Sequence, residues 1–258
     1  MATEFSGKVH FANGVPVPDK EDDDLTVTSE NAVPSVSFKP SLHGFKFANS
    51  FSGYPLPFSV PCLPGLAKVS KIYGLCGGMI SVAYDFFLAG RPISPRKEAP
   101  PKGTQLYKYL YKRQLDTFGA FGKYIVQFAQ WMSAPDDTVN GTWKRTYDEF
   151  ARIRETLDDE IPVLLGLVYV SWRDTLALWQ NHQVLAYGYT GVSDTVFHIH
   201  VYDPNFPEQD QMVIRTEKVA VAGGLAQGLK CTQQQLDGAF SKNVRGFFAM
   251  PYTPVSPP

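Results

Sequence analysis

The stretch "HQVLAYGYTGVSDTVFHIHVYDPN" (residues 182–205) contains two short runs rich in β-branched and aromatic residues, separated by a turn near Gly191. Runs of this length and composition predict β-strands. Similar runs occupy residues 163–172, 210–219 and 246–254. Because polar turns separate neighbouring runs, we expect consecutive, mostly antiparallel strands in this half of the chain.

The chain before Pro162 follows a different pattern. Apolar residues recur there at helical spacing, which predicts four helices, at 79–90, 103–119, 121–132 and 146–162. Helices followed by a sheet indicate an α+β fold rather than alternating β–α units.

The first 41 residues predict a small N-terminal β appendage and a linker. Asn13 and Gly14 lie between alternating apolar residues, which is typical of a β-hairpin. A Ser- and Pro-rich link follows at about 33–41. We therefore divide the chain into the appendage, 1–41, and one larger domain, 42–258.

Composition narrows the class of protein. The 258 residues are 44% apolar and carry a formal net charge of −1, which suits a packed globular domain. No basic block interleaves with aromatic residues, so we expect no nucleic-acid partner. No apolar run approaches the ~18 residues of a membrane span. The N-terminus lacks the apolar segment of a signal peptide, so we expect a cytoplasmic protein, or one exported by a route without a recognisable signal.

The chain contains three cysteines, Cys62, Cys76 and Cys231. They are too few for a disulfide scaffold, and no pair has the spacing of a zinc finger. A Cys62–Cys231 bridge is left open and would make Cys76 the free thiol.

Cys76 stands in "YGLCGGMIS" (73–81), directly before a predicted helix. One interpretation is a buried, inert cysteine. The other is a nucleophile, because the free N–H groups at a helix N-terminus stabilise a thiolate.

A cysteine nucleophile needs a base and a third group that orients the base. His182 follows Asn181 and opens one predicted strand, and Asp203 ends the next. Asp203 continues the apolar face of its strand, where an unpaired charge is costly, so we expect it to bond an imidazole on the adjacent strand. Asp203 also begins an Asp-Pro-Asn turn, and both roles can hold together.

His198 and His200 lie two residues apart and therefore share one face of a strand. Such a pair can hold a metal ion, but no Glu or Cys with suitable ligand spacing accompanies it. We therefore expect no metal at these histidines and no cofactor in the protein. We also expect the side chains of His198 and His200 to point away from the Cys76 cleft.

Three motifs share one order of functional residues. A cysteine stands at a helix start in "YGLCGGM", a histidine at the start of a strand in "NHQVLAYGY", and an aspartate at the end of the next strand in "HIHVYDPN". This order resembles that of papain-like cysteine peptidases, and most closely the branch that includes the bacteriocin-processing, double-glycine peptidases. The resemblance covers residues from about 70 to 215. It implies a papain-like fold and a peptide or protein substrate, cleaved through a thioester acyl-enzyme.

The resemblance also implies roles for individual residues. Cys76 would be the nucleophile, His182 the general base and acid, and Asp203 the orienting residue. The candidates for the substrate cleft are Gly77, Gly78 and Asn181. Gly77 and Gly78 would leave room beside the sulfur, although the two glycines can also simply make a tight turn.

One feature departs from the family's pattern. Its members carry a glutamine shortly before the cysteine, as a donor to the oxyanion hole. This chain has Ser70 in that region and no glutamine before Gln105. Asn49 and Tyr73 are the candidate donors, together with the backbone N–H of Cys76.

Other interpretations compete with a peptidase. Residues 74–78 also match the G-x-nucleophile-x-G elbow, which needs parallel strands alternating with helices. The same three site residues can serve a cysteine acyltransferase or amidase. A non-catalytic binding module on a peptidase-like scaffold is a further alternative. It is favoured by the missing glutamine and by Tyr107, Tyr109 and Tyr111, whose alternation departs from helical spacing and predicts that some face solvent or a groove.

Overall fold

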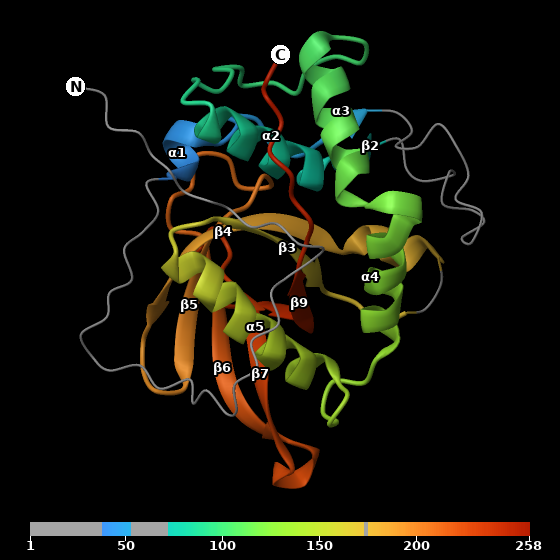
Figure 1. The fold of residues 1–258 in the computed structure, drawn as a ribbon, viewed down its shortest axis with the longest axis vertical. Coiled ribbons are helices and arrows are strands. Elements are labelled where there is room, and N and C mark those ends of the chain that lie inside the picture. Colours follow the sequence, from blue (N-terminus) through green and yellow to red (C-terminus); the bar gives the residue numbers. More distant parts are fainter. Residues whose placement is uncertain (1–37, 53–71, 173–174) are drawn as a thin grey trace.

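The computed structural model describes residues 38–52, 72–172 and 175–258, and it has an α+β fold in which the helices precede the main sheet (Figure 1). The α-helices are α1 (Pro40–His43), α2 (Cys76–Leu88), α3 (Gln105–Thr117), α4 (Lys123–Ser133) and α5 (Thr142–Asp158). Short 3-10 helices are η2 (Ala120–Gly122), η3 (Thr175–Gln180) and η4 (Ala222–Gly224). The α+β class expected from the sequence is thereby confirmed.

The strands form two antiparallel sheets within the described residues. β1 (Phe51–Ser52) pairs with β2 (Ile72–Tyr73). The main sheet contains β3 (Val163–Val168), β4 (His182–Gly191), β5 (Val196–Tyr202), β6 (Val213–Val221), β7 (Ala226–Gln233), β8 (Lys242–Val244) and β9 (Gly246–Ala249). Its order is β8-β7-β6-β5-β4-β3-β9, and every pair is antiparallel. A nucleophile elbow needs parallel strands, so this sheet argues against that interpretation.

The main sheet is strongly curled. Its two edge strands, β8 and β9, are consecutive in the chain and are separated by Arg245 alone, so the opposite edges must lie next to each other at that residue. Arg245 is almost fully buried and donates from its guanidinium to the carbonyl oxygens of Met132 (3.0 Å), Ala134 (2.6 Å) and Val170 (3.2 Å). These bonds tie the closing point of the sheet to the end of α4.

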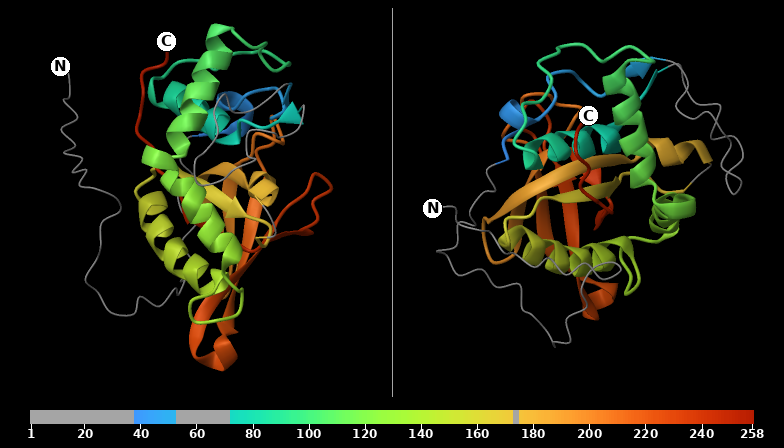
Figure 2. Two further views of the ribbon diagram at one scale, coloured as in Figure 1. Left: turned by 90° about the vertical axis from the view of Figure 1, so that its right-hand side faces the viewer. Right: turned by 45° about the horizontal axis from the view of Figure 1, so that its top comes forward.

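Helix α5 fills one face of the curled sheet. Its apolar residues Phe150, Ile153 and Leu157 pack against inward-facing residues of the strands, including Phe197 and Phe247. Figures 1 and 2 show α5 lying across the strands, with α2 and α3 at the other side of the sheet. The apolar stripe of α5 recurs at helical spacing, which is why the sequence predicts this helix well.

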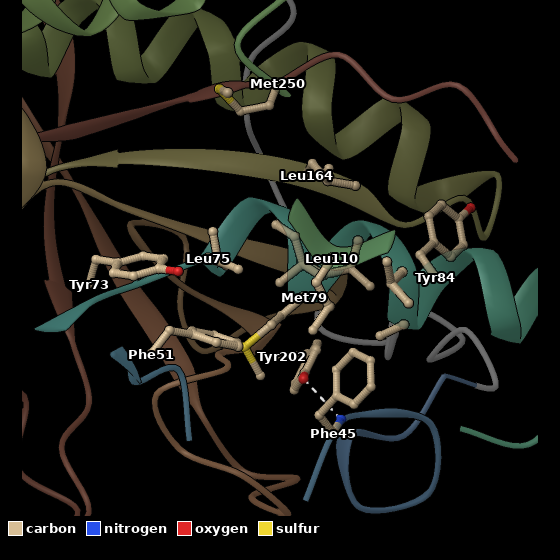
Figure 3. Packing of buried hydrophobic residues seen from close by; sticks show 14 of the residues in the cluster. Phe45, Phe51, Tyr73, Leu75, Met79, Tyr84, Leu110, Leu164, Tyr202 and Met250 are labelled. Carbon is tan, nitrogen blue, oxygen red and sulfur yellow. Dashed lines mark hydrogen bonds between the residues drawn. The ribbon is translucent and has the colours of Figure 1, made fainter. Parts of the chain in front are cut away.

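Helices α2 and α3 cover the other face. Met79 from α2, Leu110 from α3 and Leu164 from β3 belong to one buried cluster (Figure 3). The two helices approach so closely that a Cβ on Gly78 would stand 2.1 Å from the carbonyl oxygen of Leu110. The hydroxyl of Tyr202 accepts a hydrogen bond from the backbone N–H of Phe45 at 3.0 Å, which ties the N-terminal segment to the same core.

Packing begins earlier in the chain than the expected domain boundary. Phe38 is 1% exposed, and its ring lies against those of Phe87 and Tyr202. Ser41 donates from its hydroxyl to Asp210 at 2.6 Å. Residues 38–41, assigned to the linker from the sequence, therefore belong to the packed body. The expected appendage before them lies outside the described residues.

The expectation that some of the α3 tyrosines face solvent or a groove holds for Tyr111, which lines a cleft, and not for the other two. Tyr107 and Tyr109 are buried, because each hydroxyl finds a partner inside the protein. Tyr107 pairs with the hydroxyl of Tyr73, and Tyr109 donates to Asp85 at 2.7 Å. Tyr111 is half-buried.

Among the described helices, none combines the length and apolarity needed to cross a membrane.

Candidate active site

Cys76 is the first residue of α2 and is half-buried. The residue before it, Leu75, has a non-helical backbone, and its N–H donates to Oδ1 of Asn49 at 2.6 Å. Within the first turn of the helix, the N–H of Gly78 donates to Oε1 of Gln114 at 3.0 Å. Side chains from two other segments thus hold the start of the helix in place, with the cysteine at its tip.

His182 and Asp203 meet at one end of the main sheet. His182 is the first residue of β4, and Asp203 directly follows β5, the strand paired with β4. Nε2 of His182 lies 2.6 Å from Oδ1 of Asp203, and both side chains are buried. His182 is also hydrogen-bonded to the side chain of Cys76. Since Nε2 faces Asp203, Nδ1 is the ring nitrogen left for the sulfur.

The electrostatics of this group favour a charged imidazole. Burial by itself lowers the pKa of His182, but the Asp203 carboxylate and the hydrogen bonds to Asp203 and Cys76 raise it to about 10. Burial also disfavours the charged form of Asp203, which by itself raises the pKa of that carboxyl. The nearby His182 and hydrogen bonds from His182, Asn205 and Gln233 outweigh that effect, so the pKa is lowered overall. Opposite charge and hydrogen bonding therefore dominate burial at both groups.

Two further residues hold the Asp203 carboxylate. The side-chain amide of Gln233 donates to Oδ2 at 2.5 Å, and the backbone N–H of Asn205 donates to Oδ1 at 2.9 Å. Tyr169 in turn donates from its hydroxyl to Oε1 of Gln233, and its ring stacks on His182 with a centroid distance of 6.5 Å. These residues close a loop of contacts around the imidazole and the carboxylate.

Sequence reasoning did not find Gln233, Asn205 or Tyr169 as site residues. Asn205 stands in the quoted "HIHVYDPN" motif and could have been inferred from its Asx turn with Asp203. Tyr169 comes directly after β3, the strand next to His182. Gln233 ends β7, a strand the sequence analysis did not predict.

A cleft of about 540 Å³ opens beside Cys76 and His182. One wall is apolar and aromatic and comes from α3, α4 and η3: Leu115, Phe118, Ile125, Phe128, Leu178 and Trp179. Polar residues from the loops and strand ends complete the lining, including Asn49, Asn205 and Lys242. Three buried polar atoms of the lining have no hydrogen-bond partner among the described residues: Oη of Tyr111, Nε1 of Trp179 and Oε1 of Gln183.

The two candidate oxyanion-hole donors both line the cleft. The side chain of Asn49 packs closely against Gly74, because a Cβ added to Gly74 would stand 2.6 Å from Nδ2 of Asn49. The Nδ2 group donates one hydrogen to Oδ1 of Asn205 at 3.2 Å, and its second hydrogen has no assigned acceptor among the described residues. Tyr73 uses its hydroxyl on Tyr107, so its ring, rather than a free hydroxyl, faces the cleft.

The three cleft candidates differ in their placement. Gly77 and Gly78 are buried and do not line the cleft. A Cβ on Gly77 would stand 1.9 Å from Oε1 of Gln183, so these glycines serve close packing rather than substrate access. Asn181 does line the cleft, but its Oδ1 accepts the N–H of Tyr169 at 3.0 Å and its amide donates to the carbonyl of Leu178 at 3.1 Å. It therefore orders the backbone around His182.

The other histidines and cysteines lie elsewhere. His200 contacts the hydroxyl of Thr190 at 2.7 Å, His198 packs on the ring of Phe240, and neither lines the cleft. The described residues contain no cluster of three or more His, Cys, Asp or Glu side chains able to hold a metal ion. Cys231 is buried in the sheet, and burial raises its pKa. Cys231 is a free cysteine, so the bridge to Cys62 that the sequence left open is not formed. Cys62 itself lies outside the described residues.

Comparison of the chain with protein-family models, with curated proteins and with solved structures finds no match. The functional argument therefore rests on the geometry of the site.

Proposed function

We propose that this protein is a papain-like cysteine hydrolase that cleaves peptide or amide bonds through Cys76, His182 and Asp203. The observation that carries the proposal is the chain of contacts from Cys76 to His182 to Asp203, in which the histidine is bonded on both sides. A nucleophile, a base within hydrogen-bond reach and a group that orients the base are what covalent acyl transfer requires.

In the proposed reaction, Nδ1 of His182 takes the proton of the Cys76 thiol. The thiolate attacks the carbonyl carbon, and the electron pair of the C=O bond moves to the oxygen. Nδ1 of His182 gives its proton to the leaving nitrogen as the C–N bond breaks, which leaves a thioester on Cys76. His182 then takes a proton from water as the water oxygen attacks the thioester carbon; the C–S bond breaks, the acid is released, and Cys76 leaves as the thiolate beside the protonated imidazole. Asp203 keeps Nε2 bonded throughout and so fixes the orientation of the ring.

The oxyanion of this reaction needs donors that are already in place. We assign this role to the backbone N–H of Cys76 and to Nδ2 of Asn49. Asn49 is held at both ends, by Leu75 on its oxygen and by Asn205 on its nitrogen. It comes from the segment before β1, which explains why no glutamine is needed just before the cysteine.

The cleft supports a peptide rather than a small polar substrate. Its apolar wall suits a bulky aliphatic or aromatic side chain.

The test measures the reaction of Cys76 with iodoacetamide at pH 6, read by mass spectrometry of the peptide that contains it. An activated thiolate reacts fast at this pH, whereas an ordinary thiol does not. His182→Ala should slow the modification to the rate of a free thiol. Peptide and amide probes should then be cleaved by the wild-type protein and not by Cys76→Ala. Slow alkylation in the wild type would overturn the hydrolase and favour a non-catalytic binding module, while thioester transfer to an added amine would indicate an acyltransferase.

A further inference from the structure

The cleft wall next to His182 contains a cation that the proposed reaction does not use. Lys242 begins β8 directly opposite Gln233 on β7 and lines the cleft. Its ammonium lies 3.7 Å from the ring centroid of Tyr169, the same ring that stacks on His182. Cation–π contact thus holds this charge on the ring that stacks on the imidazole.

Lys242 lacks an ion-pair partner among the described residues, although it is half-buried. Burial lowers its pKa, and the Asp203 carboxylate opposes that effect from a distance. The carboxylate of Asp203 is already occupied by His182, Asn205 and Gln233. No aspartate or glutamate belongs to the described lining of the cleft. A partly desolvated cation without a counter-charge is suited to an anionic ligand.

The position of Lys242 indicates which part of a substrate it would meet. His182 protonates the leaving nitrogen, so the leaving part of the substrate must pass over the imidazole. The ring of Tyr169 connects Lys242 to the imidazole, whereas Asn49 bonds the residue before Cys76, so we assign Lys242 to the leaving-group side and Asn49 to the side of the acyl carbonyl.

We propose that Lys242 binds a carboxylate on the leaving-group side of the substrate, so that the enzyme prefers amide bonds whose released amine carries an acidic group. This inference rests on the proposed hydrolase function. The carboxylate has two sources with the same chemistry, an acidic side chain or the α-carboxylate of a released C-terminal residue. Charge pairing in the half-buried cleft supplies the selectivity.

The first experiment needs no substrate. Cys76 is alkylated with iodoacetate, which is anionic, and with iodoacetamide, which is neutral, and the ratio of the two rates is compared between variants. Lys242→Met should lower this ratio roughly tenfold, and Lys242→Arg should keep it. Lys230→Met is the matched control, because Lys230 also lies over an aromatic ring, that of Trp143 at 4.4 Å, but does not line the cleft. If Lys242→Met lowers the melting temperature, Lys242→Gln takes its place.

The second experiment compares cleavage of four probes with one acyl group and different leaving groups: glycine, glycinamide, glutamate amide and glutamine amide. A preference for glycine over glycinamide identifies an α-carboxylate, and a preference for the glutamate amide over the glutamine amide identifies an acidic side chain. Lys242→Met should abolish whichever preference exists.

The outcomes separate the two proposals. Cleavage without preference for either carboxylate, or an iodoacetate ratio unchanged in Lys242→Met or equally lowered in Lys230→Met, overturns the role of Lys242 and leaves the hydrolase standing. A ratio that falls only in Lys242→Met, with none of the probes cleaved, supports the anion site and counts against the hydrolase.

Discussion

Replacement of Asp203 by alanine tests the electrostatics of the site directly. A pKa of about 10 for His182, against an ordinary value of 6.5, corresponds to roughly 5 kcal/mol in favour of the imidazolium. Burial opposes this charge, and the charge and hydrogen bond of Asp203 are the main factors that favour it. In Asp203→Ala we therefore expect the pKa of His182 to fall to its ordinary value or below. Asp203→Asn should be milder for activity, because a neutral amide can still orient the ring.

The assay is a ¹⁵N NMR titration of the histidine side chains between pH 5 and 10, with His182 assigned from a His182→Ala sample. In the wild-type protein the His182 signal should stay in the imidazolium form through pH 8. In Asp203→Ala it should be neutral at pH 8. The half-buried rings of His43, His198 and His200, whose pKa values burial lowers, serve as internal references and should become neutral at lower pH than His182.

Stability should follow the same sign. A histidine with a raised pKa in the folded state contributes stability that is fully present below pH 6.5 and is lost as the pH rises through about 10. The difference in free energy of unfolding between wild type and Asp203→Ala should therefore shrink from pH 7 to pH 10. A wild-type His182 that titrates near 6.5, or a titration unmoved by Asp203→Ala, would refute this account of the ion pair.

Four other substitutions give three separate tests. Cys76→Ala and His182→Ala should each abolish probe hydrolysis, and the double variant should be no worse than either, because residues acting as one unit are non-additive; independent, multiplying losses would contradict this. Gly78→Ala should destabilise the protein by about 1–3 kcal/mol in denaturant unfolding, since its Cβ would meet the Leu110 carbonyl at 2.1 Å, and an unchanged stability would argue against the close helix contact. Cys231→Ser should keep the alkylation rate of Cys76 while lowering the melting temperature, because it buries a hydroxyl in an apolar site.

The predicted site residues share a feature that made them accessible to sequence analysis. Cys76, His182 and Asp203 each lie where a clearly patterned helix or strand begins or ends. The apolar pattern shows where each helix or strand begins or ends, and a residue's place in that pattern shows on which face its side chain lies. The turn at Gly191 predicts that β4 and β5 are neighbours, and neighbouring strands bring His182 and Asp203 together.

The strand that supplies Gln233 could not be predicted from apolar spacing. "AQGLKCTQ" (226–233) has few large apolar residues, and it becomes a strand because it pairs along its whole length with β6. The turn before it did carry a signal, since Gly223 and Gly224 have positive φ angles there. The burial of Tyr107 and Tyr109 could not be predicted for a related reason. Their burial depends on hydrogen bonds to Tyr73 and to a buried carboxylate, which sequence spacing does not report.

The curl of the sheet connects the fold to the chemistry. Tyr169 follows β3, and Gln233 ends β7, so in a flat sheet three strands would separate them. Their hydrogen bond exists because the sheet closes on itself at Arg245, whose backbone N–H donates to the carbonyl of Val168 at 2.8 Å. The same closure places Lys242 over the ring of Tyr169. The strand pairing alone brings His182 to Asp203, whereas the closed sheet adds Gln233, which bonds the carboxylate, the ring of Tyr169, which stacks on the imidazole, and Lys242 over that ring.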